Sequence, residues 1–450
     1  MSRSDGSDES TASGEPIPGS WRSVVLLTFA SILSFMDRSI LNLLIEPIKR
    51  DFLLSDTQIG LLVGIAFALV YVVAGLPFGW LADRISRRWI LFSGVMLWSV
   101  ATVGCGLARN FWHLFSARAG VGIGEATLTP CAHSLISDLF PRRSLARALA
   151  VYATGSNIGA GLALLIGGHV VVAVSAMPPI EIPFIGTIRP WQAAFVTVGM
   201  PGMLLALLML TLRERRRLPA PLVQRDVGTP ATMPEESFIS LLRVQRRFYV
   251  PLLASFALIA SMSYGMATWI PSLLVRRFDW TLDEVGFAYG MIILIGGTSG
   301  TLLGGVLADA LKARKCADAC LRVSFIAMIV ALPCALVAPI APSGGWTLFF
   351  VAPYWFLAAM PIALFPAALQ EVTPSAFRAR IAALSVFCVN LLGLSAGPMV
   401  VALLTDYLFA SEGKLNMSLL VMASVCMPLA LLGAWFAGRA FVAPTEVGKS

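Results

Sequence analysis

Charged residues are scarce in this chain of 450 residues. Asp, Glu, Lys and Arg make up 13% of it, against about 25% in soluble proteins. Hydrophobic residues reach 57%, and the mean hydropathy is +0.81. This composition excludes a soluble globular protein and indicates a chain that lies mostly in lipid. The net charge of +8 does not predict a nucleic-acid partner, because Lys and Arg of membrane proteins collect in cytoplasmic loops.

Metal ligands and catalytic groups are also few. The chain has three histidines and seven cysteines. Cys316 and Cys320 flank a basic loop without a nearby histidine, and no outer loop holds a cysteine pair. We therefore expect neither a four-ligand zinc site nor a disulfide framework. Because no acid pair, Ser–His couple or metal site has a usable spacing, we expect a protein that is not an enzyme and needs no cofactor.

Long apolar segments are abundant, and a spanning helix needs roughly 20 such residues. The sequence predicts twelve spans, of which 21–44 and 112–139 carry internal charge. The ten others are 57–82, 89–108, 148–180, 190–212, 248–275, 285–308, the two parts of 323–370 on either side of PIAPSGG (339–345), 381–405 and 415–438.

The loops between these spans alternate in positive charge. One set of loops, with the middle segment, holds 19 of the 33 basic residues, and the other set holds seven. The positive-inside rule therefore predicts cytoplasmic termini. Arginine outnumbers lysine 28 to 5, which favours a bacterial source and so an inner-membrane location. The predicted parts are a disordered cytoplasmic tail (1–20), a six-helix bundle (21–212), a cytoplasmic linker (213–247), a second six-helix bundle (248–442) and a C-terminal tail (443–450).

The two halves share an internal repeat. GWLADRISRR (79–88) recurs as GVLADALKAR (305–314), and PRRSLARALAVYATGSN (141–157) recurs as PSAFRARIAALSVFCVN (374–390). Two parallel six-span halves are typical of the major facilitator fold, in which substrate sites lie near the membrane midplane. We therefore predict an all-α membrane protein with twelve transmembrane helices in two pseudo-symmetric six-helix bundles.

The segment GWLADRISRR resembles the loop between spans two and three of major facilitators, although Ser86 stands where a glycine is usual. In that family the loop latches one conformer, and the resemblance implies a cytoplasmic gate. The alternative is that its arginines only set the topology. The residues assigned to the gate are Gly79, Asp83, Arg84, Arg87, Arg88, Asp309, Arg147 and Arg380.

Two spans carry charge in their interior, where a charge costs at least ~2.5 kcal/mol. Asp37 and Arg38 lie in the first span, and Arg118 and Glu125 lie in the fourth, seven residues apart on one helix face. The four charges occupy a similar depth, so we predict one formally neutral cluster, with Asp37 and Arg38 facing span four.

Two interpretations of this cluster are open. In the structural interpretation, the cluster only fixes how the helices pack. In the functional one, an arginine binds an anionic group while an acid takes up a proton. A carboxylate that loses its arginine to a substrate is favoured to bind a proton. Asp37, which is adjacent to Arg38, is the first candidate for the coupling acid, and Glu125 is the second.

The second half contrasts with the first, because spans seven, eight, ten and eleven have no ionisable group near their middle. A cavity with one charged and one apolar wall suits an amphipathic ligand. Aromatic and methionine side chains are also ordinary in lipid spans, so the alternative for each apolar residue named below is that it does not contact a ligand. The predicted ligand contacts are Arg38, Arg118, Thr129, Asn157, Asn390, Tyr264, Trp269, Met360 and Phe365.

Two long stretches resemble the spinster family of major facilitators. They are FMDRSILNLLIEPIKRDFLLSDTQIGLLVGIAFALVYVVAGLPFGWLADR (35–84) and RAGVGIGEATLTPCAHSLISDLFP (118–141). The resemblance implies transport of lysophospholipids or sphingoid phosphates, in some members with protons. It also implies that Asp37, Arg38, Arg118 and Glu125 form the polar end of the site, and that the partners are a lipid-like substrate and membrane lipid.

Other functions share part of this pattern. Organic anion:cation symporters also carry an Asp-Arg pair in span one and a Gly-x-x-Glu-Ala motif in span four, although LSDTQIGLL and DLFP favour spinster. A drug/proton antiporter and a non-transporting receptor are further alternatives. We expect a monomer with the proton as coupling ion.

Overall fold

The computed structural model describes residues 19–82, 84–177, 180–182, 186–212, 214, 235–374 and 377–441. The chain forms two compact units. The first unit comprises Met1–Arg215, Ala267–Ile295 and Pro398–Leu415. The second unit comprises Arg216–Met266, Gly296–Gly397 and Asn416–Ser450.

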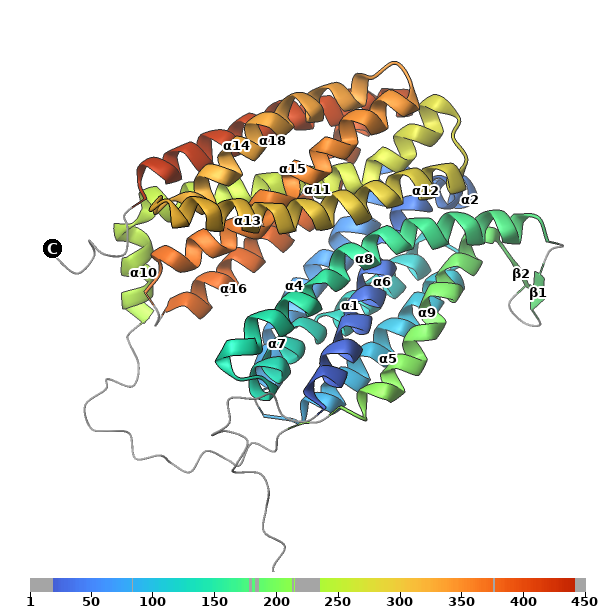
Figure 1. Ribbon diagram of the computed structural model, residues 1–450. Helices are drawn as coiled ribbons and strands as arrows, with labels where there is room; N and C mark the ends of the chain where they lie inside the picture. Colours follow the sequence, from blue (N-terminus) through green and yellow to red (C-terminus); the bar gives the residue numbers. More distant parts are fainter. Residues whose placement is uncertain are drawn as a thin grey trace, which may run out of the picture. The chain divides into compact units, whose positions relative to one another are not determined.

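The first unit is a bundle of helices with one short hairpin (Figure 1). Helix α1 packs along α8, α5 packs along α9, and α12 also packs on α8. The two strands pair antiparallel, with Glu181 opposite Thr187. Its elements are α1 (Ser20–Leu43), α2 (Ile45–Phe52), α3 (Asp56–Gly60), η2 (Leu61–Leu69), α4 (Val70–Ala82), α5 (Arg87–Gly106), α6 (Phe111–Glu125), α7 (Leu128–Leu139), α8 (Arg142–Ser175), β1 (Ile180–Ile182), β2 (Gly186–Ile188), α9 (Pro190–Met209), α12 (Leu282–Met291), η7 (Leu404–Leu408) and η8 (Glu412–Lys414).

The second unit is also built from helices, with α15 packed against both α13 and α14. Its elements are α10 (Glu235–Val244), α13 (Thr298–Ala313), α14 (Ala319–Val337), η4 (Ala338–Ile340), α15 (Gly344–Val372), α16 (Arg378–Cys388), η6 (Val389–Ala396) and α18 (Leu415–Arg439). Four elements contribute residues to both units: α11 (Arg246–Phe278), η3 (Ile292–Gly297), α17 (Gly397–Leu403) and α18, whose first residue, Leu415, belongs to the first unit.

Eleven helices in the described ranges are long and apolar enough to cross a membrane. The remaining predicted span is broken into α6 and α7, each shorter than a membrane crossing. The expectation of one continuous helix over 112–139 is therefore wrong at Ala126 and Thr127. The main-chain N–H of Thr127 turns back to Gly124 O (3.3 Å), so the helix tightens and ends directly after Glu125.

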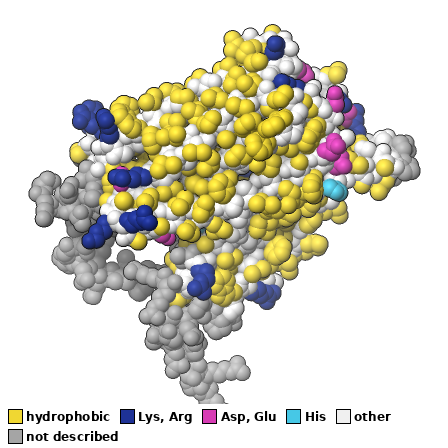
Figure 2. Space-filling view, turned by 45° about the horizontal axis from the view of Figure 1, so that its top comes forward, with side chains coloured by type: hydrophobic (Ala, Val, Ile, Leu, Met, Phe, Trp, Pro, Cys, Tyr) yellow, Lys and Arg dark blue, Asp and Glu magenta, His cyan; other side chains and the backbone are white. Residues whose placement is uncertain are grey.

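Apolar side chains cover most of the face seen in Figure 2, and basic side chains gather towards its borders. Exposed side chains include Phe29, Leu204 and Phe349. Apolar patches of this extent are rare on soluble monomers but are expected where helices face lipid tails. Four stretches, η2, η3, η6 and η7, are π-helical, a geometry that is rare and frequent at functional sites.

Candidate functional site

The centre of the site is an ion pair between the first and fourth spans. Arg38 on α1 donates from Nε to Glu125 Oε2 at 2.5 Å. The side chain of Glu125 is fully buried, while that of Arg38 is 13% exposed. Ser34, one helical turn before Arg38, donates its hydroxyl to the same oxygen at 2.7 Å. Arg38 thus meets the partner on span four that the sequence predicts.

Asp37 faces a different span. Thr102 on α5 donates its hydroxyl to Asp37 Oδ2 at 3.0 Å. Arg118 donates to the main-chain carbonyl of Asp37, also at 3.0 Å. Arg118 of span four thus contacts the main chain of Asp37. The Asp37 carboxylate interacts electrostatically with Arg118 and Glu125, while it accepts a hydrogen bond from α5. The four predicted charges do lie together within the first unit.

Aromatic rings surround Arg38. Its Cζ lies 4.8 Å from the ring centroid of Phe35, 4.9 Å from Phe67 and 4.7 Å from Tyr71. The Phe67 ring also lies 5.2 Å from the Cζ of Arg118, so both guanidinium groups contact the same ring. Such contacts contribute about 0.5–2 kcal/mol each, depending on exposure to water. Sequence reasoning missed these rings, although the i, i+4 spacing of Phe67 and Tyr71 places both on one helix face.

Two glycines of the GVGIGE segment allow the helices to approach. A Cβ at Gly122 would lie 2.7 Å from the carbonyl oxygen of Phe67. A Cβ at Gly124 would lie 2.6 Å from the main-chain nitrogen of Trp98. Side chains do not fit at such separations, so glycine is required where α6 touches η2 and α5. These contacts fix the position of Glu125 at the end of α6.

Several polar atoms of the site have no hydrogen-bond partner among the described residues. They are Asp37 Oδ1, Glu125 Oε1 and Arg118 Nε. Buried polar atoms of proteins are nearly always bonded, so each unpaired one calls for an explanation. An acceptor on each acid and a donor on one arginine give the site capacity to bind a proton, water or a polar ligand group.

Four other predicted contact residues retain accessible surface. Thr129 on α7 is exposed, and it interacts with the hydroxyl of Tyr152. Asn157 on α8, Tyr264 on α11 and Asn390 in η6 are half-buried.

Three predicted contact residues are enclosed by the fold instead. Trp269 is fully buried and donates from Nε1 to the carbonyl of Pro398 at 2.9 Å. Met360 and Phe365 on α15 are 3% and 0% exposed. Their apolar surface is used in helix packing, which is the ordinary alternative for such residues in lipid spans. In this structure they have no free surface for a ligand.

The predicted gate residues differ in their surroundings. Asp83 lies outside the described residues, and Gly79 is within α4. Arg87 is buried, and its guanidinium binds Asp138 on α7 at 2.6 Å, so it joins segments of the first unit. The remaining predicted gate residues are exposed: Arg84, Arg88, Arg147, Asp309 and Arg380.

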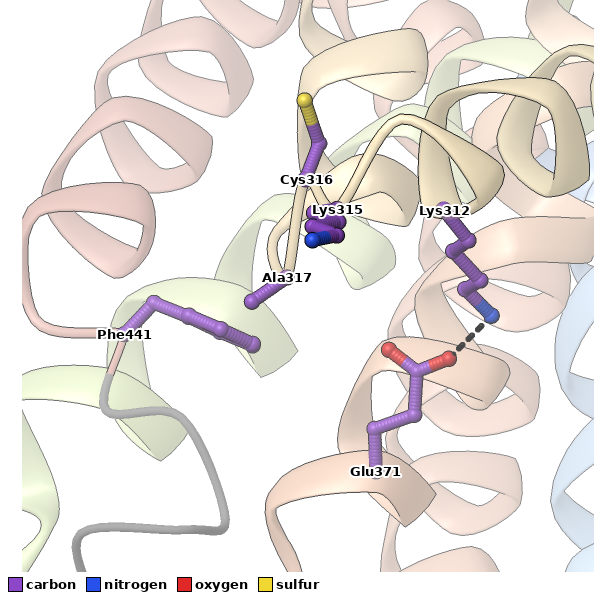
Figure 3. A pocket seen from close by; sticks show the side chains of 6 residues that line it. All are labelled: Lys312, Lys315, Cys316, Ala317, Glu371 and Phe441. Atoms are coloured by element: carbon purple, nitrogen blue, oxygen red, sulfur yellow. Dashed lines mark hydrogen bonds and ion pairs between the residues drawn. The ribbon is translucent and has the colours of Figure 1, made fainter.

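A surface hollow of about 310 Å³ lies in the second unit. Figure 3 shows Lys312 and Glu371 joined by an ion pair at its rim. Its remaining lining residues are Lys315, Cys316, Ala317 and Phe441. Within the described ranges, no three His, Cys, Asp or Glu side chains come together as a metal site would require.

Comparison with known proteins agrees with this architecture. The model of the Major Facilitator Superfamily matches residues 27–398. An MFS-type efflux pump of Mycolicibacterium smegmatis is 29% identical over 426 residues, 94% of this chain and 93% of the pump. Human protein spinster homolog 1 is 27% identical over 448 residues, 93% of this chain and 80% of that protein.

A solved structure supports the same fold. It is the crystal structure of a bacterial homolog to the human lysosomal transporter spinster, in an inward-facing and unoccupied conformation. The two chains are 24% identical, with a TM-score of 0.79 over 95% of this chain and 99% of the other. The eleven spanning helices in the described ranges, the repeat in the sequence and the family match lead to one assignment: the chain belongs to the Major Facilitator Superfamily, and its relatives include the spinster proteins.

Proposed function

We propose that this transporter moves an amphipathic anionic or zwitterionic substrate of the lysophospholipid or sphingoid phosphate class by alternating access. The observation that carries the proposal is the Arg38–Glu125 ion pair, buried among apolar helices beside Arg118. Charged groups inside membrane spans usually mark a substrate or proton pathway. An arginine with aromatic contacts and a partly exposed side chain suits a phosphate or similar headgroup, since guanidinium binds such groups in a bidentate way.

The lipid-like class has two supports. The relatives named spinster support it by similarity along most of the chain. The sequence of the second half adds apolar and aromatic side chains in spans without a central charge. A substrate with a charged head and an apolar tail would match both properties.

Proton coupling is proposed through exchange at Arg38. When the substrate's anionic group takes the guanidinium, the carboxylate that Arg38 held loses its partner and is favoured to bind a proton. That carboxylate is Glu125 in this structure, so Glu125 moves ahead of Asp37 as the coupling acid. Asp37, with its unpaired Oδ1, remains the second candidate.

The proposed setting follows the distribution of basic loops. We place both termini in the cytoplasm of a bacterial inner membrane, with the loop that holds Arg84 and Arg88 as part of the cytoplasmic gate. The functional form is proposed to be a monomer.

The test is uptake of a fluorescent lysophospholipid into proteoliposomes, with and without a pH gradient. Wild type, Glu125→Gln and Asp37→Asn are compared with Asp318→Asn, a control that alters an exposed ion pair with Arg322 on α14. We expect gradient-driven uptake by wild type and the control. We expect Glu125→Gln to lose the response to the gradient. Unchanged rate and pH profile in Glu125→Gln and Asp37→Asn would exclude both acids as the coupling group.

A second candidate function is export of a drug-like cation or small organic anion. The similarity to an MFS-type efflux pump over 94% of the chain favours this alternative. The same proteoliposomes distinguish the two functions. Flux of a small organic ion with no movement of the lysolipid would replace the proposed substrate class.

A further inference from the structure

A second buried charge network lies at the end of α1 that is remote from the N-terminus. Asp56 is its hub and has no exposed surface. Arg276 donates from NH1 and NH2 to the two carboxylate oxygens of Asp56, at 2.8 and 2.7 Å. Lys49 donates to the same carboxylate, and Glu46 accepts from Nε of Arg276 at 2.7 Å. Glu412 extends the network through an ion pair of 3.0 Å with Lys49.

The members of this network come from distant parts of the sequence. Glu46, Lys49 and Asp56 belong to the segment between the first two spans. Arg276 lies at the end of α11, and Glu412 begins η8, so both belong to the second sequence half. All five residues lie within the first unit. A neighbouring contact also joins the two sequence halves: Asp406 accepts from the main-chain N–H and the hydroxyl of Thr57, at 2.6 and 2.7 Å.

Local sequence explains how the hub is held. The chain reverses at Leu53, whose φ of 53° ends α2 in the left-handed region. Ser55 then caps α3 through a capping box with Gln58. Asp56 is the first residue of α3, where the partial positive charge of the helix end favours a carboxylate. Glu46 and Lys49 are three residues apart on α2 and therefore share one face.

We propose that this network is the gate on the side opposite the termini, and that Asp56 is its positioning residue. The inference rests on the proposed alternating access. A transporter of this type must part its two sequence halves at this end before substrate can enter or leave there. The ion pairs of Arg276 with Glu46 and Asp56, and that of Glu412 with Lys49, join the two sequence halves, so such a movement has to break them.

The burial of the network determines how it opens. Removing one partner from a buried ion pair leaves an uncompensated charge, which is strongly unfavourable. Arg276 holds Glu46 and Asp56 at once, and Asp56 keeps Lys49 when Arg276 leaves. Partial opening would therefore leave the charges of Arg276 and Glu46 without a buried partner. The gate is therefore expected to have two arrangements, fully joined and fully separated, rather than a continuum. Glu412, whose side chain is 61% exposed, contributes little because water screens its pair with Lys49.

The reporter for gate opening is Ser272, one helical turn before Arg276 on the same face of α11. Its exposed fraction is 1%, so a cysteine there is hidden while the network is joined. The seven native cysteines are first replaced, and Ser272→Cys is introduced in lipid nanodiscs. The rate of maleimide labelling then measures opening without any substrate.

We expect Asp56→Asn to raise the labelling rate at least tenfold over the Ser272→Cys parent. Arg276→Lys, which keeps the charge but cannot bridge both acids, is expected to give an intermediate rate. Glu412→Gln is the matched control within the same network and is expected to stay within twofold of the parent. Gel filtration and melting temperature establish that each variant is folded.

An Asp56→Asn variant that is folded and labels at the parental rate would overturn the proposal. If Asp56→Asn does not fold, Arg276→Lys decides by the same criterion. Because labelling needs no substrate, the result is independent of the substrate class. Faster labelling of Asp56→Asn, with no lysolipid uptake by wild type, would support the gate and reject the lipid substrate. Lysolipid uptake by wild type, with labelling of Asp56→Asn at the parental rate, would support the substrate and reject the gate.

Discussion

Replacing Gly124 with alanine should destabilise the bundle around the site. The new Cβ would lie 2.6 Å from the main-chain nitrogen of Trp98 and 2.7 Å from the carbonyl oxygen of Gly94. Ordinary contact begins at 3.4 Å, so α6 and α5 must separate by about 0.8 Å (3.4 minus 2.6). Both clashing atoms belong to a helix backbone and cannot rotate away. Overpacking of this kind costs about 1–3 kcal/mol.

Gly75→Ala is the matched control, because a Cβ at Gly75 meets nothing within 4 Å. Both substitutions gain the same helix propensity, up to about 1 kcal/mol, so their difference isolates the steric cost. For domains of 150–250 residues, each kcal/mol lost from the free energy of unfolding lowers the melting temperature by about 2–4 °C. Gly124→Ala should therefore melt about 2–12 °C below Gly75→Ala when tryptophan fluorescence is followed in detergent. Equal melting temperatures would refute the packing argument. Transport should also fall in Gly124→Ala, because a shift of 0.8 Å exceeds the ~0.5 Å tolerance of a functional site.

Two further changes test individual side chains. Glu125→Gln leaves Arg38 without its buried partner and should lower the free energy of unfolding by about 3–5 kcal/mol. Asp318→Asn, in an exposed i, i+4 pair that water screens, should lower it much less, and similar losses in thermal melts would contradict this ranking. Trp269→Phe removes the hydrogen bond to Pro398 O and should cost about 0.5–1.5 kcal/mol while the KM of uptake stays unchanged. A large rise in KM without a change in melting temperature would restore Trp269 as a substrate contact.

The sequence was sufficient to predict the spans and the two that carry charge. Apolar runs such as 190–212 correspond to α9, because a bilayer of fixed thickness demands a helix of fixed minimum length. The proximity of Asp37, Arg38, Arg118 and Glu125 could also be predicted, since the rise per residue of a helix is constant.

Contacts that depend on helix rotation and neighbours could not be predicted in the same way. Arg38 donates a hydrogen bond to Glu125, while Asp37 accepts one from Thr102, a residue that no sequence pattern singled out. The sequence predicts Trp269 at the ligand because aromatic residues line many cavities. The hydropathy of a side chain, however, is the same whether it lines a cavity or packs in the core. The sequence identifies Lys49 and Arg276 only as loop charges. Arg276 lies 220 positions from Asp56, and Lys49, although only seven positions away, reaches it through the chain reversal at Leu53.

The composition of the buried site has an electrical consequence. With both acids ionised, two carboxylates and two guanidinium groups carry no net charge, and all four lie in one unit. Movement of the empty site through the membrane field then does no electrical work. Uptake of one proton gives the site a charge of +1, on which a potential acts with about 2.3 kcal/mol per 100 mV for complete transfer. A membrane potential would therefore drive a transporter loaded with a proton and a zwitterionic substrate. It would not act on one whose substrate carries a charge of −1, and it would leave the return of the empty transporter unaffected.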